Sequence, residues 1–186
     1  ISGVSGKALS FTLNGTSVGS ATTNASGVAT LSGVSLVGIN AATYPVGLNS
    51  GVTASFDGDT SFGASSGSNT LTVAKGALTV TANSASRAFG VANPTFTSTI
   101  TGFVNSETAS VLTSQPTCTS TATTTSPASP PAYPITCSGG TATNYTFTYE
   151  NGALTITRAA LTVTAENKTK VYGAALPTLT VMYSGF

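Results

Sequence analysis

The chain has 186 residues, of which 40% are apolar and 6% are charged, and its formal net charge is +1. This charge balance offers no electrostatic surface for nucleic acid or for an anionic membrane. The sequence contains no histidine, so it lacks the side chain that most often acts as general base or metal ligand near neutral pH. No apolar run is long enough to span a membrane as a helix.

The uncharged residues favour β-structure. Thr, Val, Ile, Tyr and Phe suit pleated, half-buried strands, and Gly and Asn suit the turns between them. Disorder usually accompanies low hydrophobicity and high net charge, and this chain has neither. We therefore expect an all-β fold.

Residues 1–76 consist of short alternating runs separated by turns. Leu9, Phe11 and Leu13 alternate with polar residues, and the Asn14–Gly15 pair predicts a tight hairpin turn. A run resumes at Val28 and Leu31, further strands are predicted at 43–46, 52–56 and 70–73, and a turn is predicted at 57–59.

This stretch resembles the bacterial Ig-like repeats of surface proteins. The resemblance lies in the segment FTLNGTSVGSATTNASGVATL at 11–31, in the F-x-G-D turn at 56–59 and in a closing L-T-V strand. It implies an Ig-like β-sandwich at 1–76, and since such repeats begin with a further strand, we expect the first strand to be missing ahead of Gly6.

An internal repeat organises the rest of the chain. The run ALTVTA at 77–82 recurs as ALTVTA at 160–165, 83 residues further on. The same spacing relates Phe89 to Tyr172 and Pro94 to Pro177 without a gap; a fixed spacing over so many positions indicates tandem copies of one structural unit. We expect a second domain at 77–159 and the opening strands of a further repeat at 160–186.

Within 77–159 the pattern again predicts short strands. A turn is expected at 84–87, strands are expected at 96–100, 117–121 and 133–137, and a hairpin turn is expected at 150–152. Tyr145, Phe147 and Tyr149 alternate with threonines; because side chains alternate across a strand, the three rings should share one face and form the core.

The motifs in this unit resemble the MBG family of bacterial surface-protein repeats. They are A-L-T-V-T-A, F-G-x-x-x-P, Y-P-I-T-C-S-G and N-Y-T-F-T-Y-E-N-G-x-L-T-I-T, in the order of that family. The resemblance implies tandem Ig-like β-sandwich domains, the last one incomplete, in a large secreted or bacterial cell-surface protein.

Cys118 and Cys137 are the only cysteines. An even number in a chain of extracellular character favours a disulfide, and closing the loop of 20 residues would stabilise the fold by about 3 kcal/mol. The alternatives are two free thiols or a metal pair, although two sulfurs without histidine leave tetrahedral coordination incomplete. We do not expect an Ig-type bond between sheets, because the chain has no Trp.

Asp57 and Asp59 could offer carboxylates to calcium, but such a site needs six to eight oxygen ligands. A plain turn, in which the Asp side chains bond their own backbone, is favoured, and we expect no metal and no cofactor. A Lys-to-Asn crosslink would need a buried Lys, an Asn and a catalytic carboxylate. The candidates are Lys7 and Lys75 with Asp57, Asp59 or Glu107, and for Lys75 the interpretation as a linker charge is favoured.

We expect no enzymatic activity. The other acids, Glu107, Glu150 and Glu166, are distant from one another in sequence, whereas glycoside hydrolysis needs two carboxylates held about 5 to 9.5 Å apart. Ser or Cys nucleophiles have no histidine to activate them.

Four Asn-x-Ser/Thr sequences are possible glycosylation sites. They are Asn14, Asn24, Asn144 and Asn167.

The primary functional hypothesis is a non-catalytic spacer or stalk in an adhesin-like protein, with neighbouring repeats of the same chain as partners. Joints of about two residues, at 75–76 and 158–159, should restrict bending. The alternative is a subunit of an extracellular filament assembled by strand exchange between incomplete sandwiches. Low charge would permit lateral or head-to-tail self-association. A carbohydrate-binding module is disfavoured, because the aromatic residues lie mostly at core-type positions.

Overall fold

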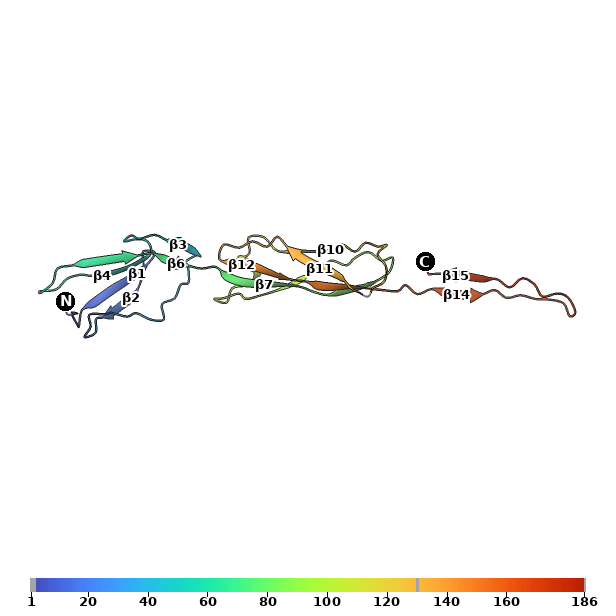
Figure 1. Ribbon diagram of the computed structural model, residues 1–186, viewed down its shortest axis with the longest axis horizontal. Helices are drawn as coiled ribbons and strands as arrows, with labels where there is room; N and C mark the ends of the chain where they lie inside the picture. Colours follow the sequence, from blue (N-terminus) through green and yellow to red (C-terminus); the bar gives the residue numbers. More distant parts are fainter. Residues whose placement is uncertain (1–2, 130, 186) are drawn as a thin grey trace. The chain divides into compact units, whose positions relative to one another are not determined.

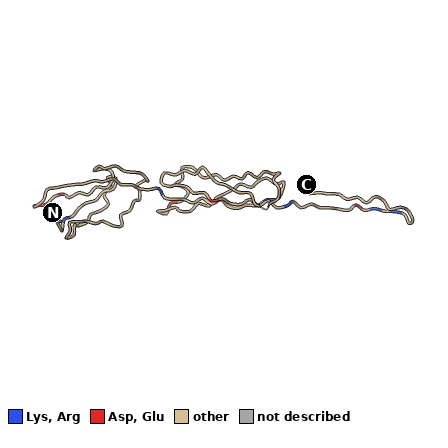
Figure 2. The backbone as a smooth tube through the Cα atoms, viewed as in Figure 1, with Lys and Arg blue, Asp and Glu red and all other residues tan. Residues whose placement is uncertain are grey.

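The computed structural model describes residues 3–129 and 131–185 and consists of short β-strands with one 3₁₀ turn, η1 (Ala109–Val111) (Figure 1). The expected all-β fold class is confirmed. The positions of charged residues are sparse along the chain (Figure 2). Among the described residues, no helix has the length and apolar character needed to cross a bilayer.

The chain separates into two compact units. The first contains the residues up to Leu78 together with Gly102–Thr113 and Thr141–Thr146, and the second contains the remainder. The division passes through strands of the 77–159 segment, so the domain boundaries expected at 76 and 159 stay predictions.

The N-terminal segment forms two sheets. One has the order β2-β1-β4-β5, with every neighbouring pair antiparallel, and the other pairs β3 with β6. Their bounds are β1 Ala8–Leu13, β2 Thr16–Thr22, β3 Ala42–Tyr44, β4 Val52–Phe56, β5 Ser65–Asn69 and β6 Leu71–Val73. The predicted hairpin between β1 and β2 is present, with Asn14 and Gly15 at φ values of 46° and 77°, as a two-residue turn with positive φ requires.

In this segment one strand was not predicted and one expectation was wrong. β5 has the sequence SSGSN, which has no apolar alternation and was not predicted, although it pairs along β4 from Val52 to Phe56. The apolar pair Val28 and Leu31 lies in a segment without strand structure. β5 therefore forms a strand because its backbone pairs with β4, and its own side chains do not account for it.

The following segment forms a three-stranded and a four-stranded sheet. The first has the order β12-β7-β9, and the second has the order β10-β11-β13-β8, in which β13 and β8 are parallel. Their bounds are β7 Gly76–Ala82, β8 Ala85–Ala88, β9 Ser98–Thr101, β10 Thr117–Ser120, β11 Tyr133–Ser138, β12 Tyr145–Glu150 and β13 Gly152–Thr157.

One core lies between these two sheets. Val80 and Ala82 of β7 belong to the same buried cluster as Ile135 of β11 and Leu154 and Ile156 of β13. Val80 and Ala82 are spaced by two residues, and so are Leu154 and Ile156, as expected for side chains that point to one face of a strand. The sheets are therefore joined mainly by aliphatic packing.

The predicted aromatic core is only partly present. Tyr145 is 3% exposed and Phe147 packs against the aliphatic cluster, but Tyr149 lies at the surface. Phe147 and Tyr149 stack with their centroids 6.3 Å apart. The aromatic strand β12 therefore lies beside the core. The centre of the core is formed by residues of β7, β11 and β13.

Two predicted turns were also wrong. Residues 84–87 were expected to turn, but Ala85–Ala88 forms β8, where Arg87 is buried. Residues 150–152 were expected to form a hairpin, but they connect β12 and β13, which belong to different sheets. The turn sequence was identified, but turn residues alone cannot distinguish a hairpin from a crossing between sheets.

The last described element is a hairpin-like pair of β14 (Thr162–Ala165) and β15 (Val181–Ser184), which lie side by side and antiparallel (Figure 1). Every residue of both strands is exposed.

Candidate functional site

The repeat appears in the structure as two antiparallel strand pairs of one register, β7 with β9 and β14 with β15. We call them the first and second hairpin, although β8 lies between β7 and β9 in the chain. In the first hairpin Val80 of β7 faces Ile100 of β9, and in the second Val163 of β14 faces Tyr183 of β15. Each second-hairpin residue stands 83 positions after its counterpart. The same offset holds for all four residue pairs of each ladder.

Hydrogen bonds beyond the ladders repeat with the same spacing. Asn83 N donates to Thr97 O at 2.9 Å, and Glu166 N donates to Thr180 O at 3.1 Å. The side chains are linked as well, because Asn83 Nδ2 donates to Thr97 Oγ1 and Thr180 Oγ1 donates to the Glu166 carboxylate. The contact is therefore kept although an amide is replaced by a carboxylate.

The turns also correspond. Gly90 and Gly173, which are repeat counterparts, have φ values of 82° and 80°, a region that favours glycine because it lacks Cβ. Val91 N donates to Ala88 O at 3.3 Å, and 83 residues later Ala174 N donates to Val171 O at 3.1 Å. The F/Y-G element of the repeat is thus a defined turn.

Burial separates the two hairpins. Leu78 and Val80 are 0% exposed, whereas their counterparts Leu161 and Val163 are 52% and 57% exposed. The four-stranded sheet covers the first hairpin, while the second presents the same apolar residues to solvent.

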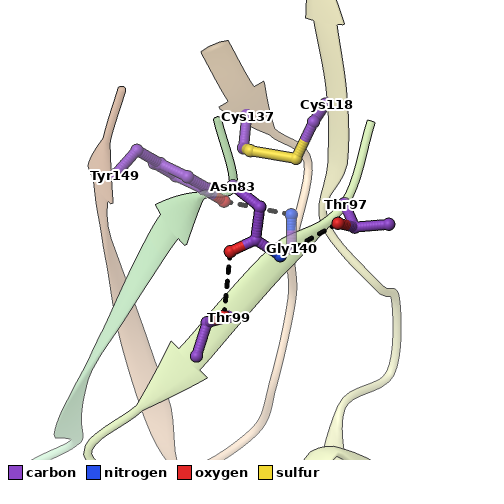
Figure 3. Close-up of a disulfide and its surroundings, with 7 residues drawn as sticks. All are labelled: Asn83, Thr97, Thr99, Cys118, Cys137, Gly140 and Tyr149. Carbon is purple, nitrogen blue, oxygen red and sulfur yellow. Dashed lines mark hydrogen bonds between the residues drawn. A yellow bond between two sulfur atoms is a disulfide. The ribbon is translucent and has the colours of Figure 1, made fainter. Parts of the chain in front are cut away.

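A disulfide links two neighbouring strands of the four-stranded sheet. Cys118 of β10 and Cys137 of β11 lie directly opposite each other in the ladder, and their Cα atoms are 4.0 Å apart. Figure 3 shows the bond beside Asn83, whose side chain bonds Thr97 and Thr99. The bond lies within one sheet and so differs from the Ig-type bond between sheets.

Asn144 forms a cluster of hydrogen bonds within the first compact unit. Its Oδ1 accepts from Ala41 N at 2.9 Å, and its Nδ2 donates to Asn40 Oδ1 at 3.1 Å. Its carbonyl accepts from Gly76 N at 2.8 Å. This predicted glycosylation site therefore has its side-chain nitrogen engaged.

The other three predicted glycosylation sites differ in environment. Asn24 Oδ1 accepts from Ser26 N and Val28 N at 2.9 and 3.1 Å, which closes a local turn. Asn14 occupies the hairpin turn after β1, and Asn167 is exposed in the segment after β14.

Glu107 and Tyr145 form a bonded pair. Tyr145 OH donates to Glu107 Oε2 at 2.5 Å and accepts from Val104 N at 3.2 Å. The pKa of Tyr145 is raised, first by the hydrogen bond to Glu107 and second by burial of the phenol. Phe103 packs edge-on against the Tyr145 ring, with centroids 5.7 Å apart.

The calcium candidates lie in the loop after β4. Asp59 contacts Lys7 Nζ and accepts from Ser61 N at 2.8 Å and Phe62 N at 2.9 Å. These bonds lower the pKa of Asp59, and the bond with Lys7 has the largest effect. Asp57 is exposed, and across residues 3–129 and 131–185 no three His, Cys, Asp or Glu side chains gather as a metal site.

The crosslink candidates have distinct surroundings. Lys7 Nζ lies 4.8 Å from the Phe62 ring centroid in addition to its contact with Asp59. Lys75 Nζ donates to Ala142 O at 3.4 Å.

The remaining acids contact hydroxyl or ammonium groups. Glu150 Oε2 accepts from Thr81 Oγ1 at 2.8 Å. Glu166 accepts from Thr180 and from Lys168 Nζ, the latter at 3.0 Å, and its pKa is lowered, first by Thr180 and then by Lys168. These contacts stabilise strand pairing rather than assembling two carboxylates.

Arg87 was not identified from the sequence. Its side chain is 7% exposed, and its nitrogens donate to Asn93 Oδ1 at 2.6 Å, Ala88 O at 3.1 Å and Thr123 O. Asn93 Nδ2 in turn donates to Ala122 O at 2.6 Å. Arg87 lies in a run that we predicted to be a turn. Nothing in that run indicated that its side chain would link two loops.

Comparison with known families matches residues 78–155 and 161–186 to the MBG domain (YGX type). The two matches start at Leu78 and Leu161, which are repeat counterparts. No curated protein and no solved structure matches the chain.

Proposed function

The chain belongs to the MBG domain (YGX type) family, and from this membership we propose that it is a structural spacer of a bacterial surface protein. MBG domains are repeat domains of such proteins. The observation that carries the proposal is the repetition of one hairpin register after 83 residues. A repeated unit adds length without adding a new chemical site.

The proposal includes a non-catalytic role that needs no metal or organic cofactor. It is supported by four of the five acids, which are engaged with Lys, Thr or Tyr partners: Asp59, Glu107, Glu150 and Glu166. A calcium ion at Asp59 would have to displace the Lys7 ammonium group. We also propose that residues 1–76 form an Ig-like domain of the same spacer.

We further place the chain outside the cytoplasm, on the cell surface or secreted. Support comes from the disulfide between Cys118 and Cys137, because such bonds persist in oxidising compartments. Its position suits a spacer under tension, since the loop it closes cannot be extended while the bond is intact.

Force spectroscopy on the full chain, held by its two ends, tests this role. We expect the 77–159 repeat to unfold in a single event. Reduction should lengthen that event by the sequence separation of 19 between the cysteines, or about 65 Å at ~3.3–3.6 Å per residue.

The Cys118→Ala/Cys137→Ala variant is the control, because it should give the longer event in both oxidising and reducing buffer. Extension of the oxidised chain without a force peak would contradict a role under tension.

A further inference from the structure

The side chain of Asn144 contacts one end of the β3–β6 sheet. Its Oδ1 accepts from Ala41 N at 2.9 Å, and its Nδ2 donates to Asn40 Oδ1 at 3.1 Å. Asn40 and Ala41 directly precede β3, and at this end of the ladder Ala42 of β3 pairs with Val73 of β6. Both polar atoms of the Asn144 side chain therefore hold the chain at the point where it enters the sheet.

The backbone of Asn144 is held by the repeat at 77–159 and by the residue that precedes it. Asn144 O accepts from Gly76 N at 2.8 Å, and Thr146 Oγ1 donates to Gly76 O at 3.2 Å. Tyr145 is 3% exposed, and its OH donates to Glu107 Oε2. A Cβ added to Gly76 would lie 3.0 Å from two atoms of the Tyr145 ring, so the ring packs closely on this glycine. Asn144 is thus presented from a well-packed part of the chain.

The β3–β6 sheet is small and needs support. Each strand has three residues, and an isolated pair of strands is at best marginally stable in water. Tyr44 OH of β3 donates to Asn40 O at 2.9 Å, which connects the sheet to the residues that Asn144 holds. All of these residues belong to the first compact unit, which combines the N-terminal segment with Gly102–Thr113 and Thr141–Thr146 of the repeat. Support from the repeat thus reaches the sheet through Asn144.

We propose that Thr141–Thr146 of the repeat is a docking surface whose partner is the β3–β6 sheet of the N-terminal segment, and that Asn144 is the residue that holds this partner. The stability of the sheet then depends on the repeat that follows it, as in repeat proteins whose neighbouring units stabilise one another. This goes beyond the spacer role, because it concerns a contact within the chain and holds whatever the whole protein carries.

Hydrogen exchange of individual amides, measured by NMR on the full chain, tests the proposal. The Ala41 amide is the direct probe, because it donates to Asn144 Oδ1. We expect Asn144→Ala to lower the protection factors of Ala41 and of the β3 and β6 amides about tenfold, because local opening of the sheet then costs less free energy. The matched control is Asn83→Ala, which removes side-chain bonds to Thr97 and Thr99 and should leave Ala41 unchanged.

Two further measurements distinguish a lost contact from a damaged fold. The amides of β11 and β13 in the core of the repeat should keep their protection in Asn144→Ala. Asn40→Ala removes the partner of Asn144 Nδ2 without any change in the repeat, and it should also lower the protection of β3. Because the two side chains share one bond, Asn40→Ala should have no further effect on β3 when Asn144→Ala is already present. Unchanged protection of β3 in either single variant, or effects of the two substitutions that multiply, would overturn the proposal.

Discussion

Val80 and Val163 occupy the same position in two hairpins of one register, yet Val80 is fully buried and Val163 is 57% exposed. The hairpin register therefore does not depend on the sheet that covers β7. Strand pairing belongs to the 83-residue repeat itself, and the burial of Val80 comes from packing against the four-stranded sheet. This separation permits tests in which the same substitution is made in a covered and in an uncovered hairpin.

The first test compares Leu78→Ala with Leu161→Ala. Leu78 is 0% exposed and Leu161 is 52% exposed. We expect Leu78→Ala to cost about 2–5 kcal/mol, as removal of a buried leucine does elsewhere, and Leu161→Ala to change little. Urea unfolding monitored by tyrosine fluorescence measures both; similar midpoints for the two variants would contradict the assigned core.

Arg87 should be a major contributor to stability. Arg87→Met removes the donors to Asn93, Ala88 and Thr123, and a hydrogen bond that involves a charged group contributes about 1.5–3 kcal/mol. The matched control is Lys170→Met at the exposed repeat counterpart, where we expect little change. Unfolding free energies from denaturant titration decide the matter, and equal losses in both variants would refute the role of Arg87.

Loss of the disulfide should destabilise the fold by about 3 kcal/mol, because the cross-link restricts a 20-residue loop in the unfolded chain. The reduced protein and the Cys118→Ala/Cys137→Ala variant should agree in their urea midpoints. If both unfold at the midpoint of the oxidised protein, the bond contributes no net stability.

The pair of Glu107 and Tyr145 predicts sensitivity to alkaline pH. Because the pKa of Tyr145 is raised in the folded state, the pair stabilises the fold below pH 10, the ordinary tyrosine value, and this contribution is lost as pH rises through the higher folded pKa. Ultraviolet titration of the native protein should show one late-ionising tyrosine. Tyr145→Phe should remove that step and Glu107→Gln should move it to lower pH; an unchanged late step in Glu107→Gln would exclude the carboxylate as its cause.

Glycosylation in a eukaryotic secretory host should discriminate among the four sites. The Asn144 nitrogen donates to Asn40, so a glycan on that nitrogen would disturb this bond, whereas Asn14 and Asn167 are exposed. We expect glycans at Asn14 and Asn167 and none at Asn144. Peptide mass spectrometry before and after glycan removal gives the answer, and full occupancy at Asn144 would show that its contacts open.

The sequence was most informative where a feature is carried by local alternation or by repetition. The bounds of β4, from Val52 to Phe56, and the Asn14–Gly15 turn follow from local patterns. The matched pairing of β7 with β9 and β14 with β15 follows from the 83-residue spacing, because identical residues at a fixed offset favour identical strand ladders.

Other features depend on contacts that no local pattern encodes. β8 contains Arg87, and its strand conformation results from parallel pairing with β13. The link from Glu150 to Gly152 carries turn residues, but the choice between a hairpin and a crossing between sheets is made by packing on either side of the core. The Asn144 cluster joins residues more than 100 positions apart, which places it beyond the range of sequence periodicity.

The most direct measurement of the spacer role uses dyes attached near the two ends of chains that contain one, two or three copies of residues 77–159. Single-molecule energy transfer or distance measurements by pulsed spin resonance then give the separation. The account predicts a constant increase per added copy, on the order of 30 Å, the length of a strand of about ten residues. A separation that does not grow with copy number would contradict it.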